Sequence, residues 1–151
     1  MSIIKKGEKA PLFNIKDQNA EDVNLENYRG KKVILSSHPL AFTSVCADQM
    51  RSLERNYDRI QEKGETVVIG LSIDPQPSKK AWAAVLNIDN VKFASDFFPL
   101  GEVAKAYGIF NEENSASKRA NIIIDEEGIV KWSKEYPQAQ LPDIEEVIEN
   151  L

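Results

Sequence analysis

Cys46 is the only cysteine in this 151-residue chain, and it stands between a strand pattern and a helix pattern. The apolar run at residues 33–35 predicts a buried strand, and a helical pattern begins at about Ser44. We therefore expect the thiol in the first turn of a helix, where unpaired backbone N–H groups and the helix dipole stabilise an anion. A thiolate is a nucleophile, so this placement indicates thiol chemistry and not a structural crosslink.

Three further residues are positioned to serve that thiol. Thr43 precedes Cys46 by three residues, and its hydroxyl can donate to the sulfur or to a bound oxygen. Arg119 directly precedes a predicted strand at residues 121–125, and residues at strand ends are expected to converge on the edge that carries the loop before Cys46. Pro39 fixes its own φ angle and favours extended geometry before it, so it can hold that loop over the thiol and limit the access of water.

Hydrophobic periodicity predicts alternating strands and helices after an N-terminal hairpin. The clearest helix spans residues 44–63, where an apolar stripe ends at Gly64 and Thr43 or Ser44 serves as N-cap. The other predicted elements are strands at 13–17, 23–25, 32–36, 66–73, 91–94, 121–125 and 129–133, and helices at 78–86 (capped by Ser78), 100–107 and from Pro142 onward. This order predicts an α/β, thioredoxin-like fold, with a central mixed β-sheet flanked by helices and an N-terminal β-hairpin extension.

Length and composition limit the class of protein. The chain is long enough for one domain over residues 1–151, and its net charge of −5 argues against nucleic-acid binding. No apolar run approaches the about 18 residues of a membrane span, and the N-terminus carries no apolar signal core, so we expect a cytoplasmic protein. With one cysteine and one histidine, we expect no zinc or other metal site and no cofactor.

The segment Pro39-Leu-Ala-Phe-Thr43-Ser-Val-Cys46 resembles the Pro-x-x-x-Thr-x-x-Cys signature of the peroxiredoxins, the AhpC/TSA family. Arg119 is similar to the distant active-site arginine of that family. The resemblance covers nearly the whole chain, and residues 95–99 and 106–112 look most like the alkyl hydroperoxide reductase E type, a one-Cys subgroup. Two departures are His38, where that subgroup often has an aromatic residue, and Asn121-Ile122 after the arginine.

The resemblance implies a thiol-dependent peroxidase that reduces hydrogen peroxide or alkyl hydroperoxides. Cys46 would attack the terminal peroxide oxygen and become a sulfenic acid. Thr43 and Arg119 would polarise the peroxide, with backbone N–H groups near Val45 and Cys46 adding hydrogen bonds. Gln49, one helical turn after the cysteine, would orient Arg119. The family also implies a homodimer.

Recycling of a sulfenic acid usually needs a second thiol, and this chain has none. An external thiol or a small redox protein must therefore act as reductant. His38 is open to two interpretations, a base for the thiol or a strand-end histidine with an ordinary hydrogen bond. Residues 97–99 and Trp82 are open to three, since they can line a dimer face, a pocket rim or the core.

Two alternative functions compete with the peroxidase interpretation. A disulfide oxidoreductase on the same fold normally uses Cys-x-x-Cys, and here Gln49 occupies the position of the second cysteine. A non-catalytic binding or holdase module on this scaffold would show no loss of the thiol in response to peroxide.

Overall fold

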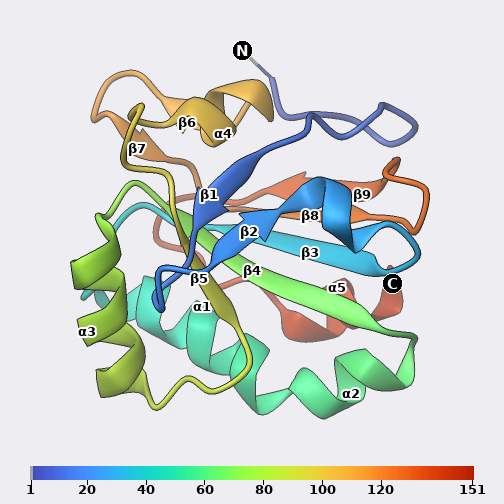
Figure 1. Ribbon diagram of the computed structural model, residues 1–151, viewed down its shortest axis with the longest axis horizontal. Coiled ribbons are helices and arrows are strands. Elements are labelled where there is room, and N and C mark those ends of the chain that lie inside the picture. Colours follow the sequence, from blue (N-terminus) through green and yellow to red (C-terminus); the bar gives the residue numbers. More distant parts are fainter. Residues whose placement is uncertain (1) are drawn as a thin grey trace.

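A seven-stranded mixed sheet forms the centre of the computed structural model, which describes residues 2–151 (Figure 1). In spatial order the strands are β2 (Asp22–Asn24), β1 (Asn14–Lys16), β5 (Lys92–Ser95), β4 (Thr66–Ser72), β3 (Lys32–Ser37), β8 (Ala120–Ile124) and β9 (Val130–Glu135). Strands β3, β4 and β5 are parallel, and the other neighbouring pairs are antiparallel. The predicted mixed sheet and N-terminal hairpin are both confirmed.

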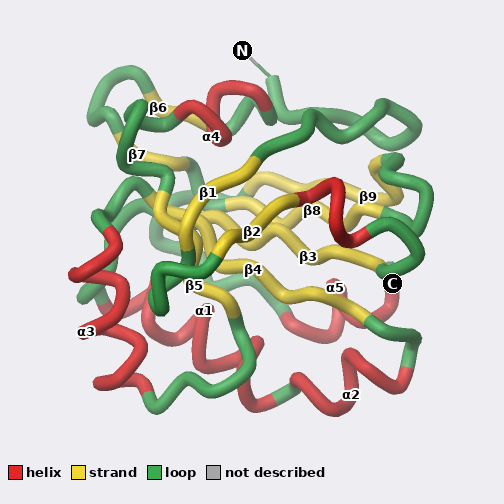
Figure 2. The backbone as a smooth tube through the Cα atoms, viewed as in Figure 1, coloured by secondary structure: helices red, strands yellow, loops and turns green. Residues whose placement is uncertain are grey.

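Each face of the sheet has its own hydrophobic core. Helices α1 (Ser44–Arg55), α2 (Tyr57–Glu62), α3 (Gln76–Leu86) and α5 (Ile144–Glu149) cover one face, and α4 (Glu102–Ala106) with the N-terminal segment covers the other (Figure 2). The alternation of strand side chains separates the two cores, because Ile34 packs beneath α1 while Val33 and Leu35 pack toward α4. The α/β, thioredoxin-like prediction is confirmed. Within residues 2–151, no helix has both the length and the apolarity to cross a membrane.

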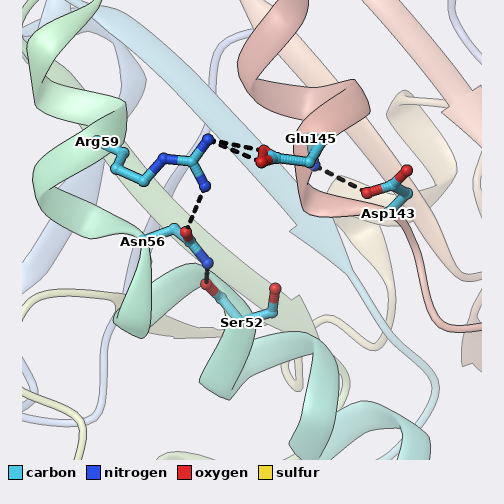
Figure 3. Close-up of polar contacts among 5 residues, drawn as sticks. All are labelled: Ser52, Asn56, Arg59, Asp143 and Glu145. Carbon is cyan, nitrogen blue, oxygen red and sulfur yellow. Dashed lines mark hydrogen bonds and ion pairs between the residues drawn. The ribbon is translucent and has the colours of Figure 1, made fainter.

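The predicted helix at residues 44–63 is wrong as a single element, since α1 ends at Arg55 and α2 starts at Tyr57. The break lies at Asn56, whose side-chain amide donates to the Ser52 carbonyl at 2.8 Å. An asparagine side chain that bonds to the backbone competes with the helical ladder, which explains the interruption. Arg59 then joins Asn56 (2.9 Å) to Glu145 of α5 (2.8 Å), and Figure 3 shows this clamp between helices distant in sequence.

Several smaller elements also differ from the prediction. Helix α3 begins at Gln76 with Pro75 as N-cap, so Ser78 is not the cap. Helix α5 begins after Asp143, whose carboxylate accepts from Glu145 N at 3.0 Å, and not at Pro142. Three short elements were not predicted, namely the 3-10 turn η1 (Leu25–Tyr28) and strands β6 (Phe110–Asn111) and β7 (Ala116–Ser117). Two-residue strands and a single turn carry too little periodicity to be recognised.

Antiparallel pairing brings the start of β8 to the end of β3. Ala120 pairs with Ser37, so Arg119 lies beside the loop that leads into α1. A parallel β8 would have its start at the opposite edge of the sheet, so Arg119 reaches the expected edge only because β8 is antiparallel to β3. The hairpin of β8 and β9 forms the edge of the sheet next to β3, and the arginine lies at the start of this hairpin.

Gly70 of β4 allows α1 to approach the sheet closely. A Cβ atom at this position would lie 2.5 Å from Met50 Sδ and 3.4 Å from Phe93 Cδ1. We expect Gly70→Val to lower the free energy of unfolding by about 1–3 kcal/mol, the usual cost of overpacking a core. Urea unfolding of both proteins measures the change. An unchanged midpoint would show that Met50 moves aside freely and that α1 is not held by this contact.

Candidate active site

Cys46 is the third residue of α1 and is 1% exposed. Thr43 is the N-cap residue, with extended backbone geometry, and the first helical hydrogen bond runs from Ala47 N to Thr43 O at 2.9 Å. The N–H groups of Val45, which is half-buried, and of Cys46 precede this bond and have no partner in the helical ladder. The sulfur is therefore buried at the positive end of the helix dipole, as the sequence predicted.

Arg119 immediately precedes β8, the strand next to β3, and its side chain extends to the sulfur of Cys46. Its Nη1 lies 3.5 Å from Cys46 Sγ, and the same nitrogen donates to Gln49 Oε1 at 2.7 Å. Arg119 is 3% exposed, so water screens its charge weakly. The structure thus brings together three of the predicted site residues: the thiol, the guanidinium and the amide one turn after the thiol.

Gln49 is held in one orientation by the end of β3. Its Nε2 donates to Ser36 Oγ at 2.6 Å and to the Ser37 carbonyl at 3.2 Å, so its Oε1 faces Arg119. The backbone carbonyl fixes which end of the amide is the donor. The signal for this contact in the sequence is the pair of adjacent serines at the end of an otherwise apolar strand.

The Gln138 carbonyl is a second anchor for Arg119. It accepts from Arg119 Nε at 2.9 Å and from Nη2 at 2.7 Å. The segment after β9 is also held against Arg119, because Tyr136 N donates to the Arg119 backbone carbonyl at 2.8 Å. A backbone carbonyl on a loop leaves no trace in residue types, so this contact was outside the reach of sequence reasoning.

Thr43 has a different partner from the one expected. Its hydroxyl donates to the Leu40 carbonyl at 2.8 Å, and the residue is exposed. Of the two acceptors expected for this hydroxyl, the sulfur and a bound oxygen, the sulfur does not receive its proton, which goes to Leu40. The oxygen retains lone pairs, so Thr43 offers an acceptor at the helix start.

Pro39 is buried and lines a pocket of about 170 Å³ together with Arg119. Ser117, Tyr136 and Gln138 line the same pocket, while Cys46 does not. Arg119 thus lines the pocket and also contacts the sulfur, which is not itself part of the pocket wall.

His38 is completely buried at the end of β3, with its Nε2 3.4 Å from Lys79 Nζ. Burial, followed by the charges of Lys79 and Arg119, lowers the pKa of His38 well below 6.5. Within residues 2–151, no hydrogen bond joins His38 to Cys46. Of the two interpretations, an ordinary hydrogen bond fits this geometry, because the ring contacts Lys79 and is a weaker base than a solvated histidine.

The aromatic residues with three possible roles, at a dimer face, a pocket rim or the core, fall into two groups. Trp82 is 1% exposed and packs on the His38 ring at 5.3 Å, so it belongs to the core. Phe97 and Phe98 are exposed, Phe98 by 90%. Among residues 2–151, no three histidine, cysteine or acidic side chains gather as they would around a metal ion.

The chain is similar to known proteins of one family. The model of the AhpC/TSA family matches residues 6–133. The alkyl hydroperoxide reductase E of Mycobacterium tuberculosis is 33% identical over 138 residues, covering 91% of this chain and 89% of the relative. A peroxiredoxin of Thermoplasma volcanium is 38% identical over 150 residues, covering 94% of this chain and 70% of the relative.

A solved structure is similar as well. The reduced 2-Cys peroxiredoxin of Plasmodium vivax superposes with a TM-score of 0.83 at 26% identity, covering 96% of this chain and 79% of that one. The chain belongs to the AhpC/TSA family, and it is an enzyme of the peroxiredoxin class.

Proposed function

We propose that this peroxidase reduces hydrogen peroxide or alkyl hydroperoxides through a sulfenic acid on Cys46. The thiolate attacks the terminal oxygen of ROOH, an S–O bond forms and the O–O bond breaks. The sulfur gives up two electrons, and the leaving alkoxide takes a proton to become ROH. The products are Cys46–SOH and an alcohol, or water when the substrate is hydrogen peroxide.

The contact between Arg119 and Cys46 carries this proposal. The guanidinium stabilises both the attacking anion and the negative charge that develops on the leaving oxygen. Four of the five guanidinium N–H groups have partners in Gln138, Gln49 and Cys46, which leaves one Nη2–H for a peroxide oxygen. The arginine is thus fixed before the substrate arrives, so little reorganisation is needed during the reaction.

Thr43 and the first helical turn complete the proposed peroxide site. The Thr43 oxygen is free to accept from a peroxide O–H, because its own proton is donated to Leu40. The N–H groups of Val45 and Cys46 supply further donors at the helix start. Pro39 lines the pocket that Arg119 also lines, and there it limits the water that enters with the substrate. A peroxide therefore meets an acceptor on one side and donors on the other.

The sulfenic acid is recycled by an external thiol. A thiol R′SH condenses with Cys46–SOH to give a mixed disulfide and water, and a second thiol releases Cys46 and R′SSR′. The observation behind this step is the absence of a second cysteine in the chain. The reductant is then a small thiol or a small redox protein.

Turnover in the presence of dithiothreitol tests the proposal. We expect continuous peroxide consumption with the thiol, one fast equivalent followed by a slower second one per protein without it, and no consumption above background by Cys46→Ser. Excess peroxide without thiol should carry Cys46 on to sulfinic acid, seen as a gain of two oxygens by mass spectrometry. Equal consumption by the wild-type protein and Cys46→Ser would refute the proposal and favour the holdase alternative.

We also propose a homodimer in the cytoplasm. Phe98 is 90% exposed and Phe97 48% exposed, and adjacent exposed aromatic residues are typical of an interface. A single cysteine agrees with a reducing compartment. Sedimentation of the wild-type protein and Phe98→Glu tests the dimer, which the charge should dissociate; two monomeric samples would contradict it.

A further inference from the structure

The loop that carries the Gln138 carbonyl is exposed, although the guanidinium that it holds is buried. Residues 137–141 are all exposed, whereas Arg119 is 3% exposed and donates two hydrogen bonds to that carbonyl. Exposed loops with few buried contacts are the mobile parts of a fold. The position of the carbonyl, and with it that of Arg119, must therefore be fixed from the ends of the loop.

Tyr136 is the buried residue at the start of this loop. It is 4% exposed, and its backbone N–H donates to the Arg119 backbone carbonyl at 2.8 Å. Its phenol donates to Glu146 Oε1 at 2.9 Å, and burial raises the pKa of this phenol, so it stays protonated. The hydroxyl thus ties the chain to helix α5 only two residues before the carbonyl of Gln138.

Glu146 is a fixed acceptor on α5. Lys134 Nζ donates to both of its carboxylate oxygens, at 2.8 and 3.0 Å, and these bonds lower the pKa of Glu146, so the side chain is a carboxylate at neutral pH. Helix α5 packs on the core beneath the sheet, and the ion pair between Arg59 and Glu145 joins it to α2 (Figure 3). The acceptor for the phenol therefore belongs to a packed helix and not to the loop.

We propose that the hydrogen bond between Tyr136 and Glu146 positions Arg119 for the peroxidase reaction, by fixing the loop whose carbonyl orients the guanidinium. The inference rests on the proposed function, in which Arg119 stabilises the charge that develops on the peroxide. The contacts are continuous from α5 to the thiol, since the guanidinium held by Gln138 lies 3.5 Å from Cys46 Sγ. Without the phenol bond, the loop moves and the remaining Nη2–H is aimed at the peroxide for less of the time.

Glu146 separates positioning from direct contact with the substrate. Tyr136 lines the pocket that Arg119 also lines, so a change at Tyr136 alters the pocket wall itself. Glu146 does not line that pocket, and its contact with Tyr136 is its connection to the site. Variants of Glu146 therefore report on the orientation of Arg119 and not on the shape of the pocket.

Two rates measured on each variant test the inference. Single-turnover oxidation of Cys46 by hydrogen peroxide needs an oriented Arg119, whereas alkylation by iodoacetamide, at a pH where the thiolate is fully formed, needs only access to the sulfur. We expect Tyr136→Phe and Glu146→Met to slow oxidation by about tenfold, because a small displacement of a catalytic group has effects of this order, and to leave alkylation unchanged. Glu146→Gln keeps an oxygen that accepts from the phenol, so it should oxidise at the wild-type rate.

Tyr57→Phe is the matched control, because it removes the same hydroxyl from a half-buried tyrosine of α2. Both of its rates should equal those of the wild-type protein. Wild-type oxidation by Glu146→Met would overturn the inference, and so would a loss confined to Tyr136→Phe, since the hydroxyl would then act in the pocket. Equal changes in oxidation and alkylation would also overturn it, because they would come from altered access to the thiol. Failure of the proposed function is distinguishable, since the wild-type protein itself would then be oxidised slowly.

NMR of the arginine side chain keeps the test decisive if Tyr136→Phe does not fold. In the wild-type protein Arg119 Nε–H is buried and donates to the Gln138 carbonyl at 2.9 Å, so this proton should exchange slowly with water. We expect the slow exchange to be lost in Glu146→Met and kept in Glu146→Gln. Equally slow exchange in both variants would show that the phenol bond does not hold the loop, and would overturn the inference.

Discussion

Arg119→Ala is expected to slow the oxidation of Cys46 by hydroperoxide by about 10²- to 10³-fold, the usual effect of removing one donor aimed at developing charge. The variant loses the contact with Sγ at 3.5 Å and the N–H that remains for the substrate. Both effects act on the chemical step. Single-turnover kinetics by stopped-flow fluorescence measure the rate constant directly, without interference from recycling.

Lys118→Ala is the control for this variant. Lys118 precedes Arg119 and lines the same pocket, but its ammonium group forms an ion pair with Glu135 at 3.8 Å. It should react at the wild-type rate. If the two variants slow the reaction equally, the effect of Arg119 comes from the general charge of this surface, and the direct role assigned to its guanidinium is wrong.

The second large effect is expected for Gln49→Met. Methionine fills a similar volume but cannot accept from Arg119 or donate to Ser36, so the guanidinium loses the contact at 2.7 Å that sets its position. A small displacement of a catalytic group can reduce the rate by up to about 10²-fold, and we expect a loss of about 10- to 100-fold. Stopped-flow oxidation at saturating thiolate separates this effect from any change in the fraction of thiolate.

Gln49→Glu and Asp48→Ala complete the comparison. The glutamate keeps an acceptor for Arg119 and loses only the donor to β3, so it should retain more of the rate than methionine. Asp48 is exposed on the adjacent position of α1, and its removal should leave the rate unchanged. A wild-type rate in Gln49→Met would show that the Gln138 carbonyl alone holds the arginine.

The sequence was sufficient to predict the outline of the fold and the contact between Cys46 and Arg119. Dense apolar runs and a proline–threonine–cysteine spacing are local signals, and they predicted β3, α1 and the placement of Cys46 in its first turn. Arg119 was found because it stands immediately before a strand. The edge at which that strand meets β3 depends on antiparallel pairing, a long-range property that residue patterns do not encode.

The remaining site features depend on the tertiary structure. Any residue at position 138 has a backbone carbonyl, so the residue type carries no signal for the contact with Arg119. The Thr43 hydroxyl can donate to the sulfur or to the Leu40 carbonyl, and the geometry of the loop decides between them. From the sequence alone, Lys79 cannot be distinguished from a surface lysine, because the adjacent Lys80 is of the same residue type and is exposed. Its burial follows from the docking of α3 on β5, with Trp82 and Phe93 closing around it.

The rate constant for the first oxidation of Cys46 tests the central claim most directly. Reduced protein is mixed with substoichiometric hydrogen peroxide, and the fluorescence of Trp82 and Trp132, which pack in or against the same cluster as the thiol, is followed alongside intact mass. We predict a gain of one oxygen on Cys46 at a second-order rate far above that of free cysteine, with no such gain in Cys46→Ser. A rate equal to that of free cysteine would mean that the helix start and Arg119 do not activate this sulfur.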